Sequence, residues 1–261
     1  MKRTLIQPNL TEFPTPLRHL LENCPVFDSS CSSEARVWFI DRDGGYYLKR
    51  SPLGTLAREA EMDRYFHSKG LTAPVLAYIS DQQDWLLTAR VPGEDCTYAP
   101  YLAEPERLCD LLATKLRELH ETPCDGCPVA DRMGEYLKTV EQNYAAGVFS
   151  RSCLPQKLQK MIADEAYRTV MQNKQLFRQD CLLHGDYCLP NILLDEWHFS
   201  GFIDLGNGGV GDRHIDLFWG VWTLQYNLKT PRYGARFLDA YGRDRVNEDL
   251  LAAIAAAECF G

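Results

Sequence analysis

The sequence predicts an α+β protein with two lobes, a small β-rich N-terminal lobe and a larger, mostly helical C-terminal lobe. Short runs of β-forming residues, separated by turn residues, fill residues 1–91, and apolar patterns with helical spacing dominate the remainder. A hairpin between Cys181 and Asp204 interrupts the helices and carries two aspartates and one asparagine. We expect an N-terminal lobe over residues 1–91, a hinge at residues 90–93, and a C-terminal lobe over residues 92–261.

The length and composition of the chain are ordinary for a soluble globular protein. The chain has 261 residues, of which 45% are hydrophobic and 25% charged, and this is enough to bury a sizeable core. No apolar run approaches the length of a bilayer span, and the N-terminal stretch MKRTLIQPNLTEF lacks the apolar segment of a secretory signal. We therefore expect a cytoplasmic protein with no membrane partner.

The net charge of the chain indicates which classes of binding partner are compatible with it. A net charge of -8 argues against a nucleic-acid partner, which would require a basic face. It is compatible with a cationic small-molecule substrate, although the charge taken alone favours a simple acidic, solvated surface.

Ten cysteines are unusual for a chain without a signal segment. Cys124 and Cys127 form a C-x-x-C motif, but no second pair follows at zinc-site spacing. We interpret the cysteines as reduced, mostly buried thiols, with a zinc or redox site as the alternative.

The N-terminal lobe is expected to carry a lysine and glutamate pair. Strands are expected on both sides of a Ser-rich turn within residues 26–40, and at residues 46–50, 74–79 and 85–89, with helices at residues 16–22 and 56–70. Lys49 lies in a strand and Glu59 in the following helix, which is the order of the ion pair that positions ATP phosphates in kinase-like folds. Glu61 could serve instead of Glu59, and each residue alone could be a solvated surface charge. The Ser-rich turn could cover phosphates or be a plain hairpin.

The C-terminal lobe is expected to be helical around the hairpin. Helices are expected from Pro105 through Leu119 and at residues 131–144, 158–177, 212–225, 233–241 and 247–260, with a Gly-rich loop at residues 206–211. That loop does not fit a dinucleotide-binding fingerprint, because it follows Asp204 and opens no βαβ unit. His120 is expected to cap carbonyls at its helix end, Asp212 to cap the next helix, and Asp216 to point back toward the hairpin.

The hairpin contains the residues that we expect to act in catalysis. His184-Gly185-Asp186 is followed by Asn191 and, one strand pair later, by Asp204. Phosphoryl transfer needs one carboxylate at the attacking hydroxyl, and an amide oxygen and a second carboxylate to hold Mg²⁺ on ATP. The D-x-x-x-x-N spacing with a later strand-end aspartate is that of the catalytic loop and metal site of the protein-kinase-like fold. We expect Asp186 to be catalytic, and Asn191 and Asp204 to bind the metal.

These motifs together resemble the aminoglycoside phosphotransferases, most closely the 3′-phosphotransferases. The resemblance covers nearly the whole chain and rests on the segments SSCSSEARV (29–37), YLK (47–49), RE (58–59), LH (119–120), DGCP (125–128), HGD (184–186), GFIDLG (201–206) and DR (212–213) with Asp216. It implies a kinase that moves the γ-phosphoryl of ATP to a sugar hydroxyl, with GTP as the alternative donor. It also implies nucleotide contacts from Ser33, Tyr47, Lys49, Ala89 and Val91, with Glu59 paired to Lys49.

The acceptor implied by the resemblance is a cationic aminosugar, bound by Asp186, Glu258 and Phe260. This chain has Ala257 where the family commonly has an aspartate, an additional Gly261, and Asn207 where an arginine is usual. The segment 144–149 also lacks acidic residues. Each missing carboxylate removes a charge-assisted hydrogen bond worth roughly 1.5–3 kcal/mol.

Two other interpretations stay open at this point. The first is a kinase of the same fold that acts on choline, homoserine, a fructosamine or a macrolide. The second is a nucleotide-binding protein without catalysis, which the presence of Lys49, Asp186, Asn191 and Asp204 disfavours.

Overall fold

The computed structural model describes residues 3–31, 35–152, 154 and 158–261, and the chain forms two compact units. The first unit comprises Met1–Asp95 and Ile192–Gly206, and the second comprises Cys96–Asn191 and Asn207–Gly261. Residues 192–206 join the first unit because the strands they form pair with a strand at its end. The chain therefore returns once to the first unit after the boundary that the sequence suggests at residue 91.

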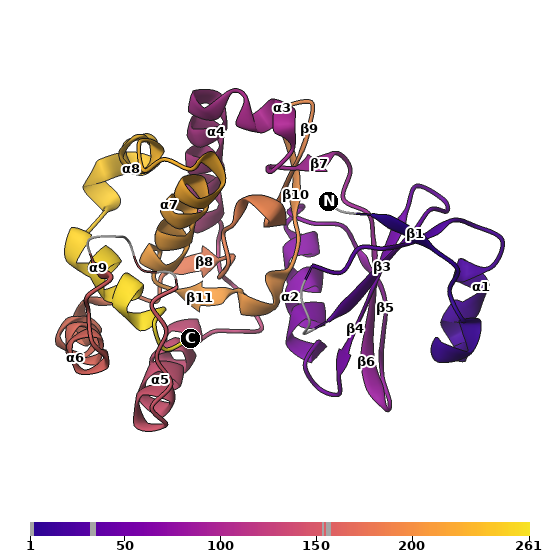
Figure 1. Ribbon diagram of the computed structural model, residues 1–261, viewed down its shortest axis with the longest axis horizontal. Coiled ribbons are helices and arrows are strands. Elements are labelled where there is room, and N and C mark those ends of the chain that lie inside the picture. The colour runs from indigo at the N-terminus through magenta and orange to yellow at the C-terminus, as the bar shows by residue number, and fades with distance from the viewer. Residues whose placement is uncertain (1–2, 32–34, 153, 155–157) are drawn as a thin grey trace. The chain divides into compact units, whose positions relative to one another are not determined.

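A six-stranded antiparallel sheet forms most of the first unit (Figure 1). Its order is β1-β2-β3-β4-β6-β5, with β1 (Thr4–Ile6), β2 (Val26–Asp28), β3 (Arg36–Ile40), β4 (Tyr46–Pro52), β5 (Val75–Ser80) and β6 (Gln83–Ala89). A turn at residues 41–45 joins β3 to β4, and Asp43 and Gly44 adopt positive φ angles of 50° and 93° there.

Two helices accompany this sheet, α1 (Arg18–Leu21) and α2 (Ala57–Ser68). Helix α2 packs against the sheet, because Leu56 and Ala60 share an apolar cluster with Leu86 of β6 and with Val75 and Tyr78 of β5. A separate core holds Phe13 against Trp38 and Trp85, whose indole rings stack 5.8 Å apart.

A second, three-stranded sheet in the first unit has the order β10-β9-β7, with β7 (Glu94–Asp95), β9 (Ile192–Asp195) and β10 (His198–Phe202). Gly93 permits the close approach of β7 and β9, because a Cβ atom at this position would lie 2.1 Å from the carbonyl oxygen of Leu194. Thr72 and Leu71 tie β10 to the chain after α2 through hydrogen bonds to the backbone of Phe202. These contacts hold the segment that ends at Asp204 in the first unit.

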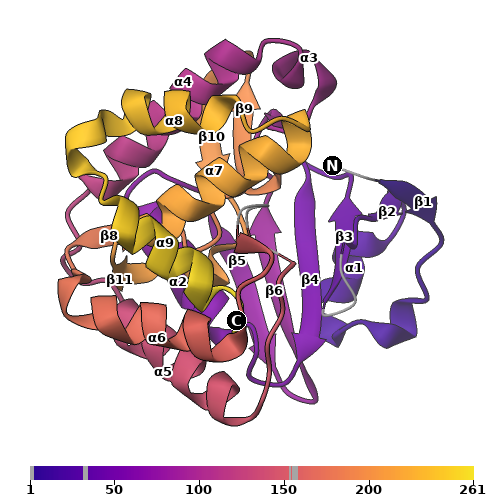
Figure 2. The same cartoon turned by 60° about the vertical axis from the view of Figure 1, so that its left-hand side comes forward.

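Helices form most of the second unit (Figure 2). They are α3 (Ala99–Leu102), α4 (Pro105–His120), α5 (Arg132–Ala145), α6 (Ala163–Asn173), α7 (His214–Leu228), α8 (Tyr233–Gly242) and α9 (Glu248–Ala257). Helix α9 packs against α6 and α7, and α4 packs against α8. Asp131 and Asn247 cap α5 and α9 by accepting hydrogen bonds from backbone N–H groups of the first turn.

Helix α6 and strand β11 of this unit differ from the sequence prediction. Helix α6 begins at Ala163, five residues after the expected start. Residues 206–211, expected to be a loop, contain the strand β11 (Gly209–Gly211), which pairs with β8 (Cys181–Leu183). The glycines make this pairing possible, because a Cβ atom at Gly211 would lie 2.7 Å from a methyl group of Leu183.

Among the described residues, no helix combines the length and the apolar content that a membrane crossing requires. The nine described cysteines are all free thiols. The thiols of Cys124 and Cys127 donate to the backbone carbonyls of Thr122 and Val129, respectively.

Candidate active site

Lys49 lies between two carboxylates in the first unit. Its Nζ is 2.9 and 2.7 Å from the two carboxylate oxygens of Glu59 and 2.9 Å from Oδ1 of Asp204. Strand β4 presents the lysine, α2 presents the glutamate one turn from its start, and the segment after β10 presents the aspartate. The structure thus brings together three of the residues expected to act at the nucleotide, and it selects Glu59 over the exposed Glu61.

The charges around Lys49 keep it protonated. Burial alone would lower the pKa of the lysine, but the adjacent Glu59 and Asp204 outweigh this effect and raise it. Asp63, one turn further along α2, is 6% exposed, and burial together with the charge of Glu59 raises its pKa well above the usual range. Asp63 was not among the predicted site residues, although its i+4 spacing from Glu59 indicates a shared helix face.

Asp204 has a backbone conformation that non-glycine residues seldom adopt. Its φ angle is 61°, in the left-handed region, and its side chain is 51% exposed. Residues held in such conformations are concentrated at functional sites. The exposed carboxylate is a ligand type that Mg²⁺ prefers.

The other nucleotide residues expected from the sequence occupy the same unit. The hydroxyl of Tyr47 accepts a hydrogen bond from Arg3 at 2.9 Å, and its ring packs against Phe39. The N–H of Ala89 donates to the carbonyl of Pro74, so this donor is used within the protein. Val91 follows β6 with a buried side chain. Ser33 lies outside the described residues.

Asp186 and Asn191 form a hydrogen-bonded pair in the second unit. The side-chain amide of Asn191 donates to Oδ2 of Asp186 at 2.8 Å and to its backbone carbonyl at 3.0 Å. These bonds close the five-residue loop and fix the direction of the Asp186 carboxylate. Because Asn191 uses its amide nitrogen here, its carbonyl oxygen remains the atom suited to a hard cation.

Asp216 holds the backbone that leads into this loop. Its buried carboxylate accepts hydrogen bonds from the N–H groups of His184 and Gly185, each at 2.8 Å. His120 lies 3.2 Å away through Nε2, and its Nδ1 is 2.8 Å from the hydroxyl of Tyr241. Since the carboxylate can only accept, Nε2–H donates to Asp216 and Nδ1 accepts from Tyr241.

This arrangement corrects the expectation for His120. The histidine is the last residue of α4, but it contacts the side chains of Asp216 and Tyr241 and no helix carbonyl. Burial lowers the pKa of its imidazole, and this favours the neutral form that both hydrogen bonds require.

Gly185 cannot be replaced without displacing the loop. Its φ angle is 83°, and a Cβ atom would lie 1.9 Å from the backbone oxygen of Asn207. The same oxygen accepts a hydrogen bond from Arg132 of α5 at 2.8 Å. The glycine is therefore required both by its backbone conformation and by the close approach of the neighbouring segment.

Glu258 lies in the second unit at the C-terminal end of α9, within a polar cluster that the sequence did not reveal. The hydroxyl of Tyr136 donates to its carboxylate at 2.7 Å. Burial raises the pKa of Glu258 to about 7, against the effects of Tyr136, Arg132 and a hydrogen bond from Trp219, and the charge of Asp186 contributes to the rise. The i, i+4 spacing of Arg132 and Tyr136 could have indicated that both face the same side of α5.

Phe260 has a different place from the one expected. Its side chain is 1% exposed and packs against Tyr144, Phe149 and Tyr167 in the core of the second unit. The ring therefore stabilises the end of the chain and is not open to an acceptor, which corrects the substrate-binding role expected for this side chain.

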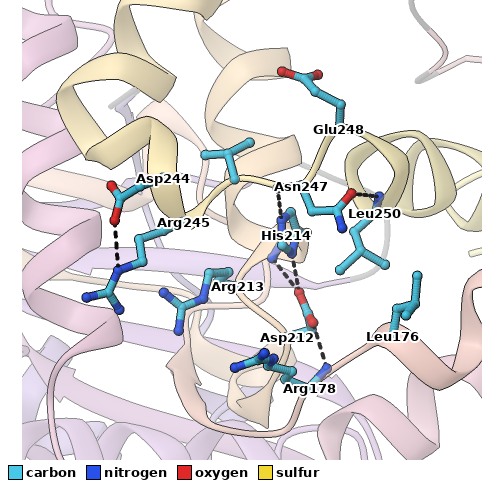
Figure 3. Close-up of a pocket in the computed structure, with 11 residues that line it drawn as sticks. Leu176, Arg178, Asp212, Arg213, His214, Asp244, Arg245, Asn247, Glu248 and Leu250 are labelled. Atoms are coloured by element: carbon cyan, nitrogen blue, oxygen red, sulfur yellow. Dashed lines mark hydrogen bonds and ion pairs between the residues drawn. The ribbon is translucent and has the colours of Figure 1, made fainter.

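A cavity of about 630 Å³ lies elsewhere in the second unit, and none of the site residues expected from the sequence lines it (Figure 3). Beside it, Nδ1–H of His214 donates to the buried carboxylate of Asp212 at 2.6 Å, and Nε2 accepts from the N–H of Asn247 at 2.9 Å. Asp212 also accepts from the N–H groups of His214 and Arg178, so it connects three segments at the start of α7.

Comparison with known proteins agrees with these motifs. Residues 27–253 match the model of the phosphotransferase enzyme family. The chain is 49% identical to a probable aminoglycoside 3′-phosphotransferase of Lactococcus lactis subsp. lactis, over 97% of each chain.

Solved structures share the fold. An aminoglycoside-3′-phosphotransferase of type VIII superposes with a TM-score of 0.78 at 24% identity, over 94% of this chain and 97% of the other. The aminoglycoside phosphotransferase APH(3″)-Id of Streptomyces rimosus, solved with ADP and streptomycin, gives a TM-score of 0.70 at 23% identity, over 98% of this chain and all of the other. The fold is thus the kinase-like fold predicted from the sequence, and the chain belongs to the aminoglycoside phosphotransferases of the phosphotransferase enzyme family, which are small-molecule kinases.

Proposed function

We propose that this enzyme transfers the γ-phosphoryl group of ATP to the 3′-hydroxyl of an aminoglycoside antibiotic in the cytoplasm and so inactivates the drug. The observation that carries the proposal is the contact of Lys49 with both Glu59 and Asp204 in the first unit. The relative from Lactococcus lactis supports the acceptor class and the 3′ position through its name.

In this proposal the first unit binds the nucleotide. Lys49 carries the positive charge that the phosphates require, and Glu59 holds its ammonium group in place. Tyr47 packs on the base, the backbone near Val91 pairs with its edge, and Ser33 contacts the phosphates. GTP would make the same phosphate contacts.

The second unit supplies the group that meets the acceptor. Asp186 orients the hydroxyl and accepts its proton late, because a loose transition state needs little early deprotonation. The hydrogen bond from Asn191 fixes one carboxylate oxygen, which leaves the other for the hydroxyl. Catalysis then depends mainly on positioning and on charge stabilisation.

Asn191 and Asp204 carry the oxygen ligands that would hold Mg²⁺, and their donor chemistry fits this cation. The metal would supply charge neutralisation on the phosphates. Glu258 would receive an ammonium group of the acceptor, since a nearby cation favours its charged form.

An acceptor panel tests the proposal. Purified enzyme with Mg·ATP would be assayed for ADP release with kanamycin, neomycin, choline, homoserine, a fructosamine and a macrolide, with Asp186→Ala as the catalytically impaired control. We expect turnover with at least one aminoglycoside, and a loss of about 10²–10⁴-fold or more in the variant with ATP binding retained. Turnover of another compound class alone would overturn the acceptor assignment, and near-normal rates in the variant would overturn the role of Asp186.

A second measurement tests the position of transfer. A kanamycin analogue that lacks the 3′-hydroxyl should bind but should not be phosphorylated. Phosphorylation of that analogue would show that another hydroxyl is the acceptor.

A further inference from the structure

Three aromatic side chains form a row along helix α7. Trp219, Trp222 and Tyr226 are spaced three and four residues apart, so they lie on one side of the helix. The ring centroids of Trp219 and Trp222 are 5.3 Å apart in an edge-to-face contact, and those of Trp222 and Tyr226 are 4.9 Å apart with nearly parallel planes. We call these three residues the aromatic row.

Core packing does not account for the whole row. A stripe with this spacing is commonly the buried face of a helix, and Trp219 and Trp222 do pack in part against the core of the second unit. Tyr226, however, is 57% exposed, and Trp222 is only half-buried. The row therefore extends from the core to the surface, which is an arrangement suited to a ligand with apolar faces.

The inner end of the row meets the candidate active site. Trp219 makes a hydrogen bond to Glu258 that helps to lower its pKa, and the charge of Asp186 acts on the same carboxylate from the other direction. Trp219 is therefore in contact with a group that lies within electrostatic reach of the proposed catalytic aspartate.

The outer end of the row already interacts with an ammonium group. Nζ of Lys229, the residue that follows α7, lies 4.3 Å from the ring centroid of Tyr226. This distance is within the range of a cation–π interaction. The Tyr226 ring is thus placed to attract a cation in this protein.

The part of α7 that bears the aromatic row supplies no carboxylate for a cationic acceptor. Residues 219–228 of α7 and the segment 144–149 contain no aspartate or glutamate. Tyr144 and Phe149 pack against Phe260 in the core. Recognition of positive charge beyond Glu258 and Asp186 would then rely on aromatic faces.

We propose that the aromatic row is a subsite for the part of a multi-ring aminosugar that lies away from the reacting ring. The apolar C–H face of the remote sugar ring packs on Trp222, and an ammonium group of that ring lies against Tyr226 in place of Lys229. The proposal rests on the proposed function, because it assigns a place to the same class of acceptor.

The experiment compares Trp222→Leu and Tyr226→Leu with the wild-type enzyme. Leucine keeps apolar bulk but removes the aromatic face. Tyr98→Leu is the matched control, because Tyr98 is a similarly exposed tyrosine whose ring makes an edge-to-face contact with Tyr101 of α3. Calorimetry would give the Kd of neomycin and of neamine, the smaller fragment of neomycin that lacks the remote rings, without nucleotide. Steady-state assays would give kcat and KM.

We expect the Kd and the KM for neomycin to rise about tenfold in either row variant. The Kd and KM for neamine, the KM for ATP and kcat should stay within about twofold. This is the pattern expected when a lost contact had stabilised the bound substrate and the transition state equally. Tyr98→Leu should match the wild type. Tyr226→Leu decides the question if Trp222→Leu folds poorly, because Tyr226 is exposed.

The outcomes separate this proposal from the proposed function. Turnover of neomycin with a Kd that neither row variant changes would overturn the subsite and leave the function intact. Equal losses for neomycin and neamine would also overturn it, since the row would then act on the reacting ring. Binding of neomycin that depends on the row, with no turnover of any aminoglycoside, would overturn the proposed function and support the subsite. Failure of neomycin to bind would overturn the subsite, and the proposed function would then be decided by turnover of the other aminoglycosides.

Discussion

Nζ of Lys49 lies 2.9 Å from Oδ1 of Asp204, although 155 positions separate the two residues in the chain. The contact joins β4 to the segment that follows β10, and both belong to the first unit. Glu59 occupies the other side of the lysine. The lysine thus offsets part of the charge of the two carboxylates and holds the side chain of Asp204, whose backbone is left-handed.

Asp204→Asn should abolish phosphoryl transfer and leave the fold intact. The substitution keeps the size of the side chain but removes the charge that a divalent cation requires. We expect that Mg²⁺ will no longer increase the thermal stabilisation given by ATP, which can be measured as the difference in Tm with ATP in the presence of Mg²⁺ and of EDTA. Asp195→Asn, at an exposed position at the end of β9, is the control and should behave as wild type. A full Mg²⁺ effect in Asp204→Asn would contradict the metal-binding role.

Lys49→Met should destabilise the protein in a pH-dependent way. The lysine pKa is raised by Glu59 and Asp204, so its stabilising charge is present throughout the neutral range. Without it, Glu59, Asp63 and Asp204 repel one another, and the folded variant gains protons that the unfolded chain does not bind. We expect a loss of roughly 3–5 kcal/mol in the free energy of unfolding at pH 8, which decreases as the pH falls toward 5.

The control for this variant is Lys174→Met, which removes the exposed ion pair between Lys174 and Glu141. Surface pairs of this kind contribute only about 0–1 kcal/mol. Urea unfolding at pH 8 and pH 5.5 gives both values. An equal loss at the two pH values in Lys49→Met would show that charge repulsion is not the cause.

Asp216→Ala should lower kcat far more than it changes the KM for ATP. It leaves the buried N–H groups of His184 and Gly185 without their acceptor, and each such group costs about 1–3 kcal/mol. Asp216→Asn keeps one acceptor oxygen and should fall between the alanine variant and the wild type. Steady-state kinetics combined with thermal unfolding measures both effects. A wild-type kcat in the alanine variant would contradict the view that Asp216 positions the Asp186 loop.

The sequence predicted the parts of the site that depend on local spacing. Lys49 and Glu59 follow from strand and helix patterns, and the Asp186–Asn191 pair follows from a five-residue interval that one loop can close. The role of the glycines in β11 could not be predicted in the same way. Their close contacts involve Leu183, Val129 and Arg132, which are remote in the chain.

Burial explains why the structure places Phe260 and His120 differently from the sequence prediction. Phe260 has the same residue type whether it binds a ligand or packs in a core, and only its contacts with distant aromatic rings show that it is buried. His120 was predicted to cap the carbonyls at its helix end, because its position in the helix can be inferred from the sequence. Its contact with Tyr241, which is remote in the chain, cannot be inferred in this way. The tertiary contacts of His120 and Phe260 therefore escaped prediction, whereas the contact of Asp216 with the His184–Gly185 backbone was expected.

Glu258→Gln should make binding of a cationic acceptor less dependent on pH. With its pKa raised to about 7, Glu258 is mostly neutral at pH 6 and mostly charged at pH 8, while Arg132 and Asp186 are the other charged groups that act on it. Glutamine keeps a hydrogen-bond acceptor for Tyr136 but carries no charge at either pH. We therefore expect acceptor affinity about tenfold lower than wild type at pH 8 and nearly equal affinity at pH 6, measured by calorimetry. Since ionisation of the acceptor affects both proteins equally, the ratio of their Kd values isolates Glu258. A ratio that is the same at both pH values would contradict a direct interaction of this carboxylate with the acceptor.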